Sequence, residues 1–307
     1  MLKLKRIEDP ILKPEPQHTW ESRAVLNPAA VREGEKIHML FRAVEGDNLS
    51  TIGYAVLDRY GRLLQRSNEP LIEREFDYEK QGAEDPRITQ FGGRYYVLYS
   101  GYDGLTCRVC MASTDDFVKV QKHGVIIPEV WDKDAMLFPE PVRGKIILMH
   151  RIEPSIQLAW LDDIEQLLAV DRSYWNNHFA HLAEHTVLSP RCAWEAEKIG
   201  GGAPPIMTDH GWLVIYHGVD RHWVYRAGAA LLELDNPNRV IARLPYPILE
   251  PQRSYEMHGD VANVIFPEGT AVFDGELQVF YGGADKVIAM AVASLEELLC
   301  ELLKHKE

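Results

Sequence analysis

The sequence predicts an all-β protein, and three observations support this prediction. Short runs rich in β-branched and aromatic residues recur along the 307 residues, bounded by Gly, Pro, Asn or Asp. One arrangement of these runs returns at a spacing of roughly 50 to 65 residues. Helical patterns are scarce: only "DDIEQLLAV" and the final "SLEELLCELLKHKE" are persuasive, and the latter should pack on the outside of the sheets.

Five copies of the arrangement follow one another. Each has a proline, a short strand, a Gly-containing turn and an apolar-aromatic strand that closes on Arg, Ser, His or Gly. The copies begin at Leu26, Glu84, Leu137, Gly202 and Val264. A third strand follows most copies, as in "TIGYAVLD" and "VIAMAVAS", and a fourth often ends at a proline, as in "GVIIPE" and "YPILEP".

Four short strands per unit and five units describe a five-bladed β-propeller with a C-terminal helix. We expect residues 1–307 to form a single catalytic domain of this kind. A β-sandwich with many hairpins is the alternative.

Composition narrows the classes of partner. A net charge of −13 argues against nucleic acid or an anionic membrane as the main partner. The N-terminus lacks the apolar core of a signal peptide, and no apolar run approaches the roughly 20 residues that cross a bilayer. Four cysteines do not make a disulfide framework, and Cys107 and Cys110 lie three apart in a predicted strand, facing opposite sides. We therefore expect a cytoplasmic protein.

A propeller brings equivalent positions of its units to one central funnel. At the position before the motif proline, Asn27 and Asp85 are polar, whereas Phe138 and Ala203 are not. At the end of the second strand, the equivalent residues are Arg42, Ser100, His150, His217 and Gly282. An acid and several cationic or imidazole groups should therefore face one axis.

This set of side chains suits cleavage of a glycosidic bond. Such cleavage normally needs two carboxylates, one as acid and one to activate water or to attack. Only Asp85 is an obvious acid here, whereas Arg42, Lys133, Lys198 and His217 could hold phosphate. If phosphate is the nucleophile, the second carboxylate is unnecessary, and the reaction is phosphorolysis.

An ordered set of motifs resembles glycoside hydrolase family 130, which comprises mannoside phosphorylases and some β-mannosidases on a five-bladed propeller. The motifs run over nearly the whole chain: "LNPAAV", "GAEDPR", "KDAMLFP", "HR", "KIGGGAPPI", "YHGVD" and "YGGAD". The resemblance implies that Asp85 is the catalytic acid, which delivers its proton through the 3-hydroxyl of the bound mannose. Inverting attack by phosphate would then release α-mannose 1-phosphate.

The resemblance also implies binding roles for other residues. The positions that match phosphate ligands of the family are Arg42, Lys133, Lys198 and His217, with Arg151 added to that pocket. Asn27, Arg87 and Asp285 resemble mannose contacts, and Glu84 is interpreted as a structural residue or a sugar ligand. Tyr255 and Glu256 also fall in a family-like stretch and are expected to contact substrate. Where some relatives carry an Arg-Asn pair, this chain has Lys133 and Asp134, which leaves its phosphate affinity open.

We expect no metal or organic cofactor, with inorganic phosphate as co-substrate. His178, His181 and His185 are interpreted as loop or aglycone-side residues rather than metal ligands. Trp175 and Tyr174 could form a platform for a sugar ring, although aromatic residues are more often part of the core.

The sequence thus predicts an inverting phosphorylase for β-1,2-mannobiose or β-1,2-oligomannan. The alternatives are a β-1,4-mannooligosaccharide phosphorylase, a β-mannosidase and a non-catalytic carbohydrate-binding propeller. Family members often self-associate, so a homo-oligomer is an option that the sequence leaves open.

Overall fold

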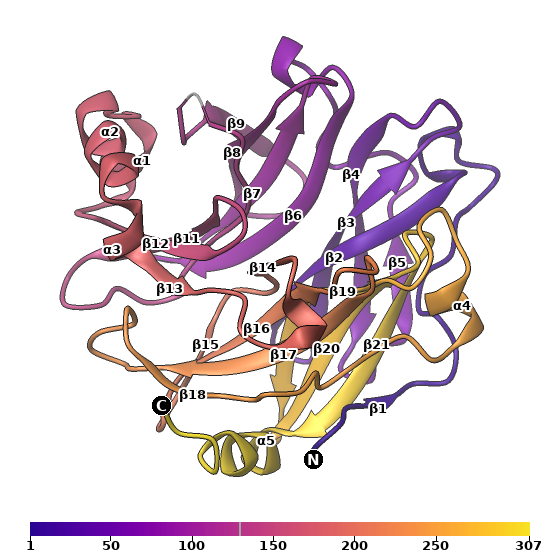
Figure 1. The fold of residues 1–307 in the computed structure, drawn as a ribbon. Helices are drawn as coiled ribbons and strands as arrows, with labels where there is room; N and C mark the ends of the chain where they lie inside the picture. Colours follow the sequence, from indigo (N-terminus) through magenta and orange to yellow (C-terminus); the bar gives the residue numbers. More distant parts are fainter. Residues whose placement is uncertain (129) are drawn as a thin grey trace.

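The computed structural model describes residues 1–128 and 130–307, and antiparallel β-sheets dominate it (Figure 1). The all-β prediction is confirmed. The pairing of strands divides the chain into successive antiparallel units, of which the first two are joined by a single parallel bridge from Ser50 to Gly82.

Each unit contains a meander of neighbouring strands. The first unit is made of β2 (Ala24–Glu33), β3 (Lys36–Val44), β4 (Ser50–Asp58) and β5 (Leu63–Arg66). The second is made of β6 (Gly82–Phe91), β7 (Arg94–Tyr102), β8 (Cys107–Thr114) and β9 (Val120–Val125). The third is made of β10 (Lys133–Leu137), β11 (Ile146–Arg151), β12 (Ile156–Leu161) and β13 (Thr186–Leu188).

The last two units each have an additional feature. The fourth contains β14 (Lys198–Gly201), β16 (Gly211–Val219), β17 (Tyr225–Leu232) and β18 (Val240–Arg243), with β15 (Ile206–Thr208) also paired to β16. The fifth contains β19 (Ile265–Phe273), β20 (Glu276–Gly283) and β21 (Val287–Ser294). Its fourth strand is β1 (Lys5–Arg6), so the beginning of the chain completes the last unit.

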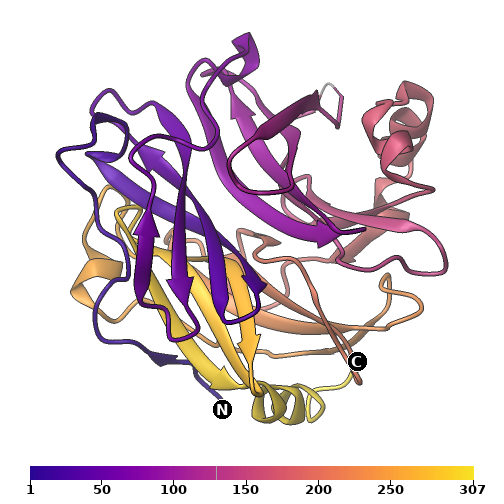
Figure 2. The same ribbon diagram turned by 180° about the vertical axis from the view of Figure 1, so that it is seen from behind.

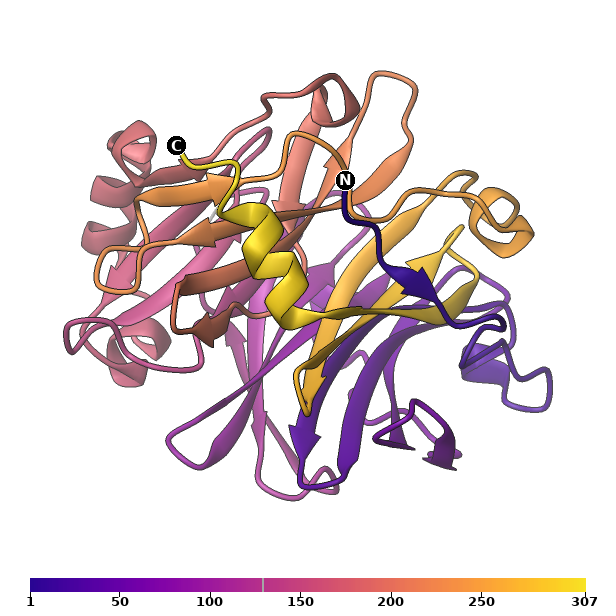
Figure 3. The same ribbon diagram turned by 90° about the horizontal axis from the view of Figure 1, so that it is seen from below.

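Helices are few and lie outside the sheets. α1 (Ile164–Leu168), α2 (Arg172–Ala180) and α3 (Leu182–His185) lie between β12 and β13, and Figures 1 and 2 show them together at one edge of the molecule. α4 (Ser254–Met257) precedes β19. The predicted C-terminal helix is confirmed as α5 (Leu295–Leu302), which lies across the outer side of the sheets in Figure 3 and buries Leu298, Leu299 and Leu302.

Five main hydrophobic cores lie between units rather than within them. Residues of the first and second units share one core, and the same holds for the second and third, the third and fourth, and the fourth and fifth. The fifth core joins the last unit back to the first, through side chains such as Phe273 and Ile37. The units therefore follow one another in a cyclic order, in which each buries its apolar faces against two neighbours.

An aromatic-Glu pair repeats at the start of four units. The pairs are Trp20-Glu21 and Tyr78-Glu79 in the 3-10 helices η1 (Thr19–Glu21) and η2 (Asp77–Glu79), Trp194-Glu195 in η3 (Ala193–Glu195), and Tyr255-Glu256 in α4. Each glutamate is buried and forms an ion pair with a basic residue of its unit's fourth strand: Arg66, Lys122, Arg243 and Arg6. These pairs tie the outer strand of a unit to the turn that precedes its inner strand.

Candidate active site

β-Bulges in the inner strands aim polar side chains toward one place. The pairing register shifts at Asn27 in β2, at Asp85 in β6, at Asp134 in β10 and at Glu268 in β19. Asn27, Asp85 and Asp134 have φ angles of 51°, 51° and 56°, the left-handed region that suits Asn and Asp. A bulge leaves its extra residue unpaired and redirects the side chain, which explains how strands from different units present these groups together.

Asp85 is buried at the centre of this group. Its Oδ1 accepts a hydrogen bond of 2.7 Å from Asn27 Nδ2 and lies 3.4 Å from Arg42 Nη1. Its Oδ2 lies 3.6 Å from Lys133 Nζ. Residues that are 58, 43 and 48 positions apart in the chain thus meet at one carboxylate, as the repeat register predicted for Asn27 and Arg42.

The charges around Asp85 keep its carboxylate ionised. Burial raises its pKa, but the positive charges of Arg42 and Lys133 outweigh burial and lower the pKa to about 2. The neighbouring Glu84 behaves in the opposite way: burial raises its pKa, although Arg42 Nη2 donates a 2.8 Å hydrogen bond to it. Arg42 therefore contacts two adjacent carboxylates, Glu84 and Asp85, whose pKa values are shifted in opposite directions.

A second group of charged side chains, which is fully buried, centres on Arg87 and Asp134. Arg87 Nη2 lies 3.0 Å from Asp134 Oδ1 and 2.7 Å from Glu268 Oε1, and all three side chains are fully buried. Arg87 also donates to the backbone oxygens of Asp85 and Gly201. It therefore links the inner strands of the second, third, fourth and fifth units.

Asp134 joins Arg87 to the predicted phosphate residues. Arg151 Nη1 lies 3.1 Å and His217 Nε2 lies 3.7 Å from Asp134 Oδ2. Burial raises the pKa of Asp134, but Arg151 and Arg87 reverse this effect and lower it. Burial lowers the pKa of His217 to about 3, so its imidazole is neutral at neutral pH and packs on Phe266 at a centroid distance of 4.3 Å.

Lys198 lies nearer to solvent and shares a carboxylate with Arg151. Its Nζ is 2.8 Å from Glu153 Oε1, and Arg151 Nη2 is 3.3 Å from the same oxygen. The exposed fractions of the Lys133, Lys198 and Glu153 side chains are 26%, 15% and 45%. The Arg42 side chain is 19% exposed, so an oxyanion that enters from solvent meets Lys133, Arg42 and Lys198 before the buried Arg151 and His217.

Asp285 is a further carboxylate near this centre. It has a φ of 51° and lies in the turn between β20 and β21. Burial raises its pKa to about 6, against the opposing effect of Arg42. Its carboxyl group therefore takes up a proton at a higher pH than an exposed aspartate does.

Tyr255 and Glu256 stand apart from this network. The Glu256 carboxylate accepts hydrogen bonds from Arg6, from Tyr281 and from the backbone N–H groups of Gln252 and Arg253. It is the fourth copy of the aromatic-Glu pair. These contacts favour a structural role over the substrate contact that was predicted for Glu256.

The expected register is wrong in the third unit. Its first strand is β10, which ends at Leu137, so the equivalent of Asp85 is Asp134 and not Phe138, which lies in a hydrophobic core. Across from the residue before the bulge lie Arg42 in the first unit and Arg151 in the third, whereas His150 faces a different group. The proline guided the alignment in the sequence, but the third unit carries alanine after its bulged residue.

His150 and His178 belong to a buried chain of polar groups beneath α2. Asp132 Oδ2 lies 2.6 Å from His150 Nδ1, and His150 Nε2 lies 2.9 Å from His178 Nε2. Trp175 is fully buried beside them, so it belongs to the core and forms no sugar platform. In the described part of the chain, no cluster of three or more His, Cys, Asp or Glu side chains could hold a metal ion.

Asp134 and Glu268 are site residues that were not assigned from the sequence. Both could have been found from the bulge pattern, because each occupies the position of Asn27 and Asp85 in its own strand.

Over the described residues, no helix combines the length and the apolar character that spanning a membrane requires.

Comparison with known proteins agrees with this arrangement. The sequence profile described as beta-1,4-mannooligosaccharide phosphorylase, glycoside hydrolase family 130, matches residues 3–304. The chain is 38% identical to a 1,2-beta-oligomannan phosphorylase and 39% identical to a beta-1,2-mannobiose phosphorylase, both from Thermoanaerobacter sp. (strain X514). Each match covers 97% of this chain and 99% of the relative.

A solved structure shows the same fold. It is a beta-1,2-mannobiose phosphorylase from Listeria innocua in complex with beta-1,2-mannobiose, with a TM-score of 0.84, 24% identity and coverage of 98% of this chain and 99% of that chain. The profile match and the two full-length relatives establish the family. The chain belongs to glycoside hydrolase family 130.

Proposed function

We propose that this protein is an inverting phosphorylase that cleaves β-1,2-mannosidic bonds with inorganic phosphate and releases α-mannose 1-phosphate. The observation that carries the proposal is the buried carboxylate of Asp85, set between Asn27, Arg42 and Lys133, with further cations in the same region. The two full-length relatives are named for β-1,2-linked mannosides, which supports this linkage.

We infer that residues 1–307 form one domain, a five-bladed propeller. The cyclic sequence of cores between units supports this, as do the bulged inner strands and the completion of the last unit by β1. In a propeller the inner strands line a central funnel, which would place Asn27, Asp85 and Lys133 of the inner strands there.

The charges around Asp85 suggest how phosphate serves catalysis. In the resting enzyme Arg42 and Lys133 hold the pKa of Asp85 at about 2, so at neutral pH it is ionised and carries no proton to donate. A phosphate anion that pairs with Lys133 would weaken this effect and raise the pKa, so that Asp85 can hold the proton that the leaving sugar oxygen needs. Phosphate is thus both the nucleophile and the group that prepares the acid.

Asn27, Glu84, Arg87 and Asp285 line or support the place where the mannose ring would bind. Phosphate would bind among Arg42, Lys133, Arg151, Lys198 and His217. Asp134 neutralises Arg151 and Arg87, whereas the side chains of Lys133, Arg42 and Lys198 stay partly exposed to an incoming anion.

The test is to incubate the protein with β-1,2-mannobiose, with and without phosphate, and to measure mannose 1-phosphate and free mannose. Phosphate-dependent mannose 1-phosphate supports the proposal. Free mannose that forms without phosphate would identify a β-mannosidase instead. The same assay with β-1,4-mannobiose tests a second candidate, the β-1,4-specific phosphorylase, which the description of the matching family profile favours.

A further inference from the structure

Asp132 is a buried aspartate that lies directly before Lys133, the first residue of β10. Its side chain is fully buried, and its ion-pair partner is the imidazole of His150, a weaker base than lysine or arginine. Burial of a carboxylate is costly unless hydrogen bonds replace the lost hydration. The chemistry proposed for Asp85 does not use Asp132, so its burial points to another role.

The Asp132 carboxylate bonds to the strand that carries Arg151. Its Oδ1 accepts a hydrogen bond of 3.0 Å from Arg151 N–H, and its Oδ2 lies 2.6 Å from His150 Nδ1. Lys133 and Arg151 are opposite each other in the pairing of β10 with β11. A carboxylate that directly precedes Lys133 and holds the backbone of Arg151 therefore controls the spacing of two cations in the proposed phosphate pocket.

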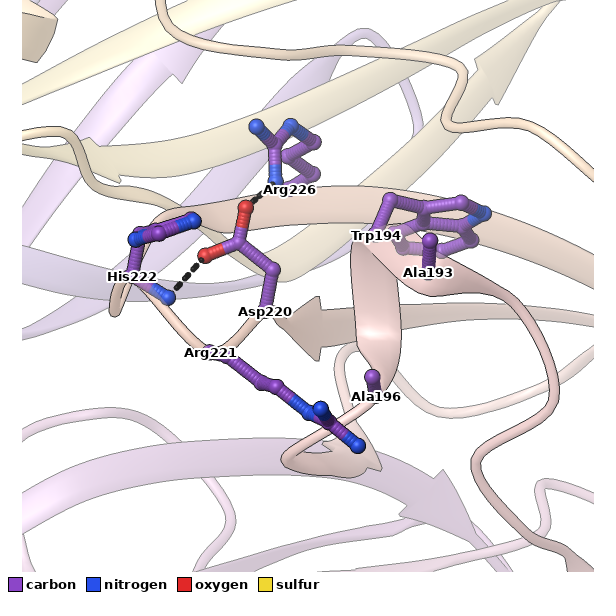
Figure 4. A pocket seen from close by; sticks show the side chains of 7 residues that line it. All are labelled: Ala193, Trp194, Ala196, Asp220, Arg221, His222 and Arg226. Carbon is purple, nitrogen blue, oxygen red and sulfur yellow. Dashed lines mark hydrogen bonds and ion pairs between the residues drawn. The ribbon is translucent and has the colours of Figure 1, made fainter.

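In two other units an aspartate holds the turn that follows it. The Asp220 carboxylate accepts hydrogen bonds from two backbone N–H groups of the turn after β16 and from Arg226 of β17, beside the pocket drawn in Figure 4. Asp103 makes equivalent bonds after β7. In the third unit an isoleucine follows β11. Asp132 comes instead from the start of the neighbouring strand, so its bonds join two strands at the site.

A chain of hydrogen bonds continues from Asp132 to helix α2. His150 Nε2 lies 2.9 Å from His178 Nε2, and two imidazole nitrogens at this distance need one proton between them. A carboxylate only accepts, so His150 Nδ1 donates to Asp132. Burial lowers the pKa of His178 to about 3, so its ring is neutral. When His178 Nε2–H donates to His150, it fixes the tautomer of His150 that Asp132 requires.

Helix α2 holds His178 in a fixed place. The Tyr174 hydroxyl donates a 2.8 Å hydrogen bond to the backbone oxygen of Trp160 in β12. Trp175 is fully buried and makes edge contacts with the rings of His150 and His178, at centroid distances of 6.0 and 5.5 Å. The helical segment between β12 and β13 is therefore connected to the site through one buried imidazole.

We infer that Asp132 is a positioning residue for phosphate binding, which holds Lys133 and Arg151 at the spacing that the anion needs, and that His178 supports it through His150. The inference rests on the proposed phosphorylase function and adds to it a role for the helical segment. Asp132, His150 and His178 act through the two cations and do not touch the anion.

The experiment measures the KM for phosphate and for β-1,2-mannobiose in D132A and H178L, and the Kd of inorganic phosphate by calorimetry without sugar. Both phosphate constants should rise, about tenfold or more in D132A and about threefold in H178L, because a small displacement of a binding group weakens its contact. The KM for mannobiose should change by less than about twofold. H178Q should restore the native phosphate constants, because the glutamine amide can donate in place of Nε2.

Matched controls make the same substitutions far from the cations. Asp58 accepts hydrogen bonds from two backbone N–H groups in the β4–β5 turn, and His210 is exposed in the turn between β15 and β16. D58A and H210L should leave both KM values unchanged. Thermal unfolding identifies the folded variants, and H178L with H178Q carries the test if D132A does not fold.

Three results would overturn the inference. One is a lowered Tm with unchanged phosphate constants in folded H178L and D132A, which would mean that the chain of hydrogen bonds serves stability alone. The second is an equal rise in the KM for phosphate and for sugar. The third is H178Q that behaves like H178L. Native protein that forms no mannose 1-phosphate from β-1,2-mannobiose would refute the proposed function instead, so the two failures are distinguishable.

Discussion

Asp85 is the side chain on which the proposed chemistry depends most. It is buried, it is held by Asn27, Arg42 and Lys133, and its φ of 51° at a bulge directs it to the site. Asp85→Asn removes the acid but keeps a side chain of similar shape, so kcat should fall by about 10²- to 10⁴-fold while the protein stays folded. Steady-state kinetics and thermal unfolding measure this, with Asp115→Asn, an exposed change, as the control. Native-like rates would exclude Asp85 as the acid.

Lys198 is a cation within reach of an incoming anion. Lys198→Ala should raise the KM for phosphate about tenfold or more and change the KM for the sugar much less, because a charged hydrogen bond to phosphate is lost. The control is Lys304→Ala, which changes a well exposed lysine that follows α5. Equal effects on both KM values would remove Lys198 from the phosphate pocket.

Asp285 makes stability depend on pH. Its pKa is about 6 in the folded protein against an ordinary value of 3.8. Below pH 3.8 it is protonated in both states; between pH 3.8 and 6 the unfolded chain releases the proton first, so stability falls as pH rises. Asn cannot ionise, so the free energy of unfolding of Asp285→Asn minus that of the native protein should be larger at pH 7.5 than at pH 4, meaning that the variant gains relative stability as pH rises.

Urea unfolding at the two pH values measures this difference. Asp47→Asn, an exposed change in the β3–β4 loop, is the control. A difference that is independent of pH would show that the Asp285 carboxyl group is not perturbed by folding.

Among the structural elements, the aromatic-Glu turns carry the clearest energetic role. Glu195 is fully buried, and its carboxylate accepts hydrogen bonds from Arg243 and Tyr216. Glu195→Ala leaves a buried arginine unpaired, which should lower the free energy of unfolding by about 3–5 kcal/mol. The exposed pair of Glu233 and Arg239 is a matched control, since Glu233→Ala should cost about 0–1 kcal/mol. Similar losses in both variants would contradict this assignment.

The bulged inner strands are the elements that create the site. A strand without a bulge alternates its side chains between two faces, so neighbouring Glu84 and Asp85 would point apart. In the structure Arg42 contacts both carboxylates. The sequence pattern predicted the strands, but its alignment on the proline gave Phe138 as the third-unit equivalent of Asp85, four residues after Asp134, which occupies the bulge.

At the scale of the whole molecule, strand β1 completes the last unit and so links the beginning of the chain to its end. β1 pairs with β21, Leu4 enters the core between the fourth and fifth units, and Arg6 neutralises the buried Glu256. Removal of residues 1–6 should therefore lower Tm by at least about 5 °C. Lys3→Ala, which removes an exposed ion pair with Glu250, should leave Tm nearly unchanged. An unchanged Tm in the truncated protein would show that β1 contributes little to stability.

The family, the all-β class, the C-terminal helix and the contact of Asp85 with Arg42 and Asn27 could all be read from the sequence. They could be read because strand patterns and turn residues are local, and because internal repetition converts distance along the chain into proximity. The tertiary structure decided the rest: the pairing of Arg87 with Asp134 and Glu268, and the ion pair of Glu256 with Arg6. Each of these depends on how bulges and packing bring together charges more than 40 residues apart, and no local pattern specifies which cation neutralises which carboxylate.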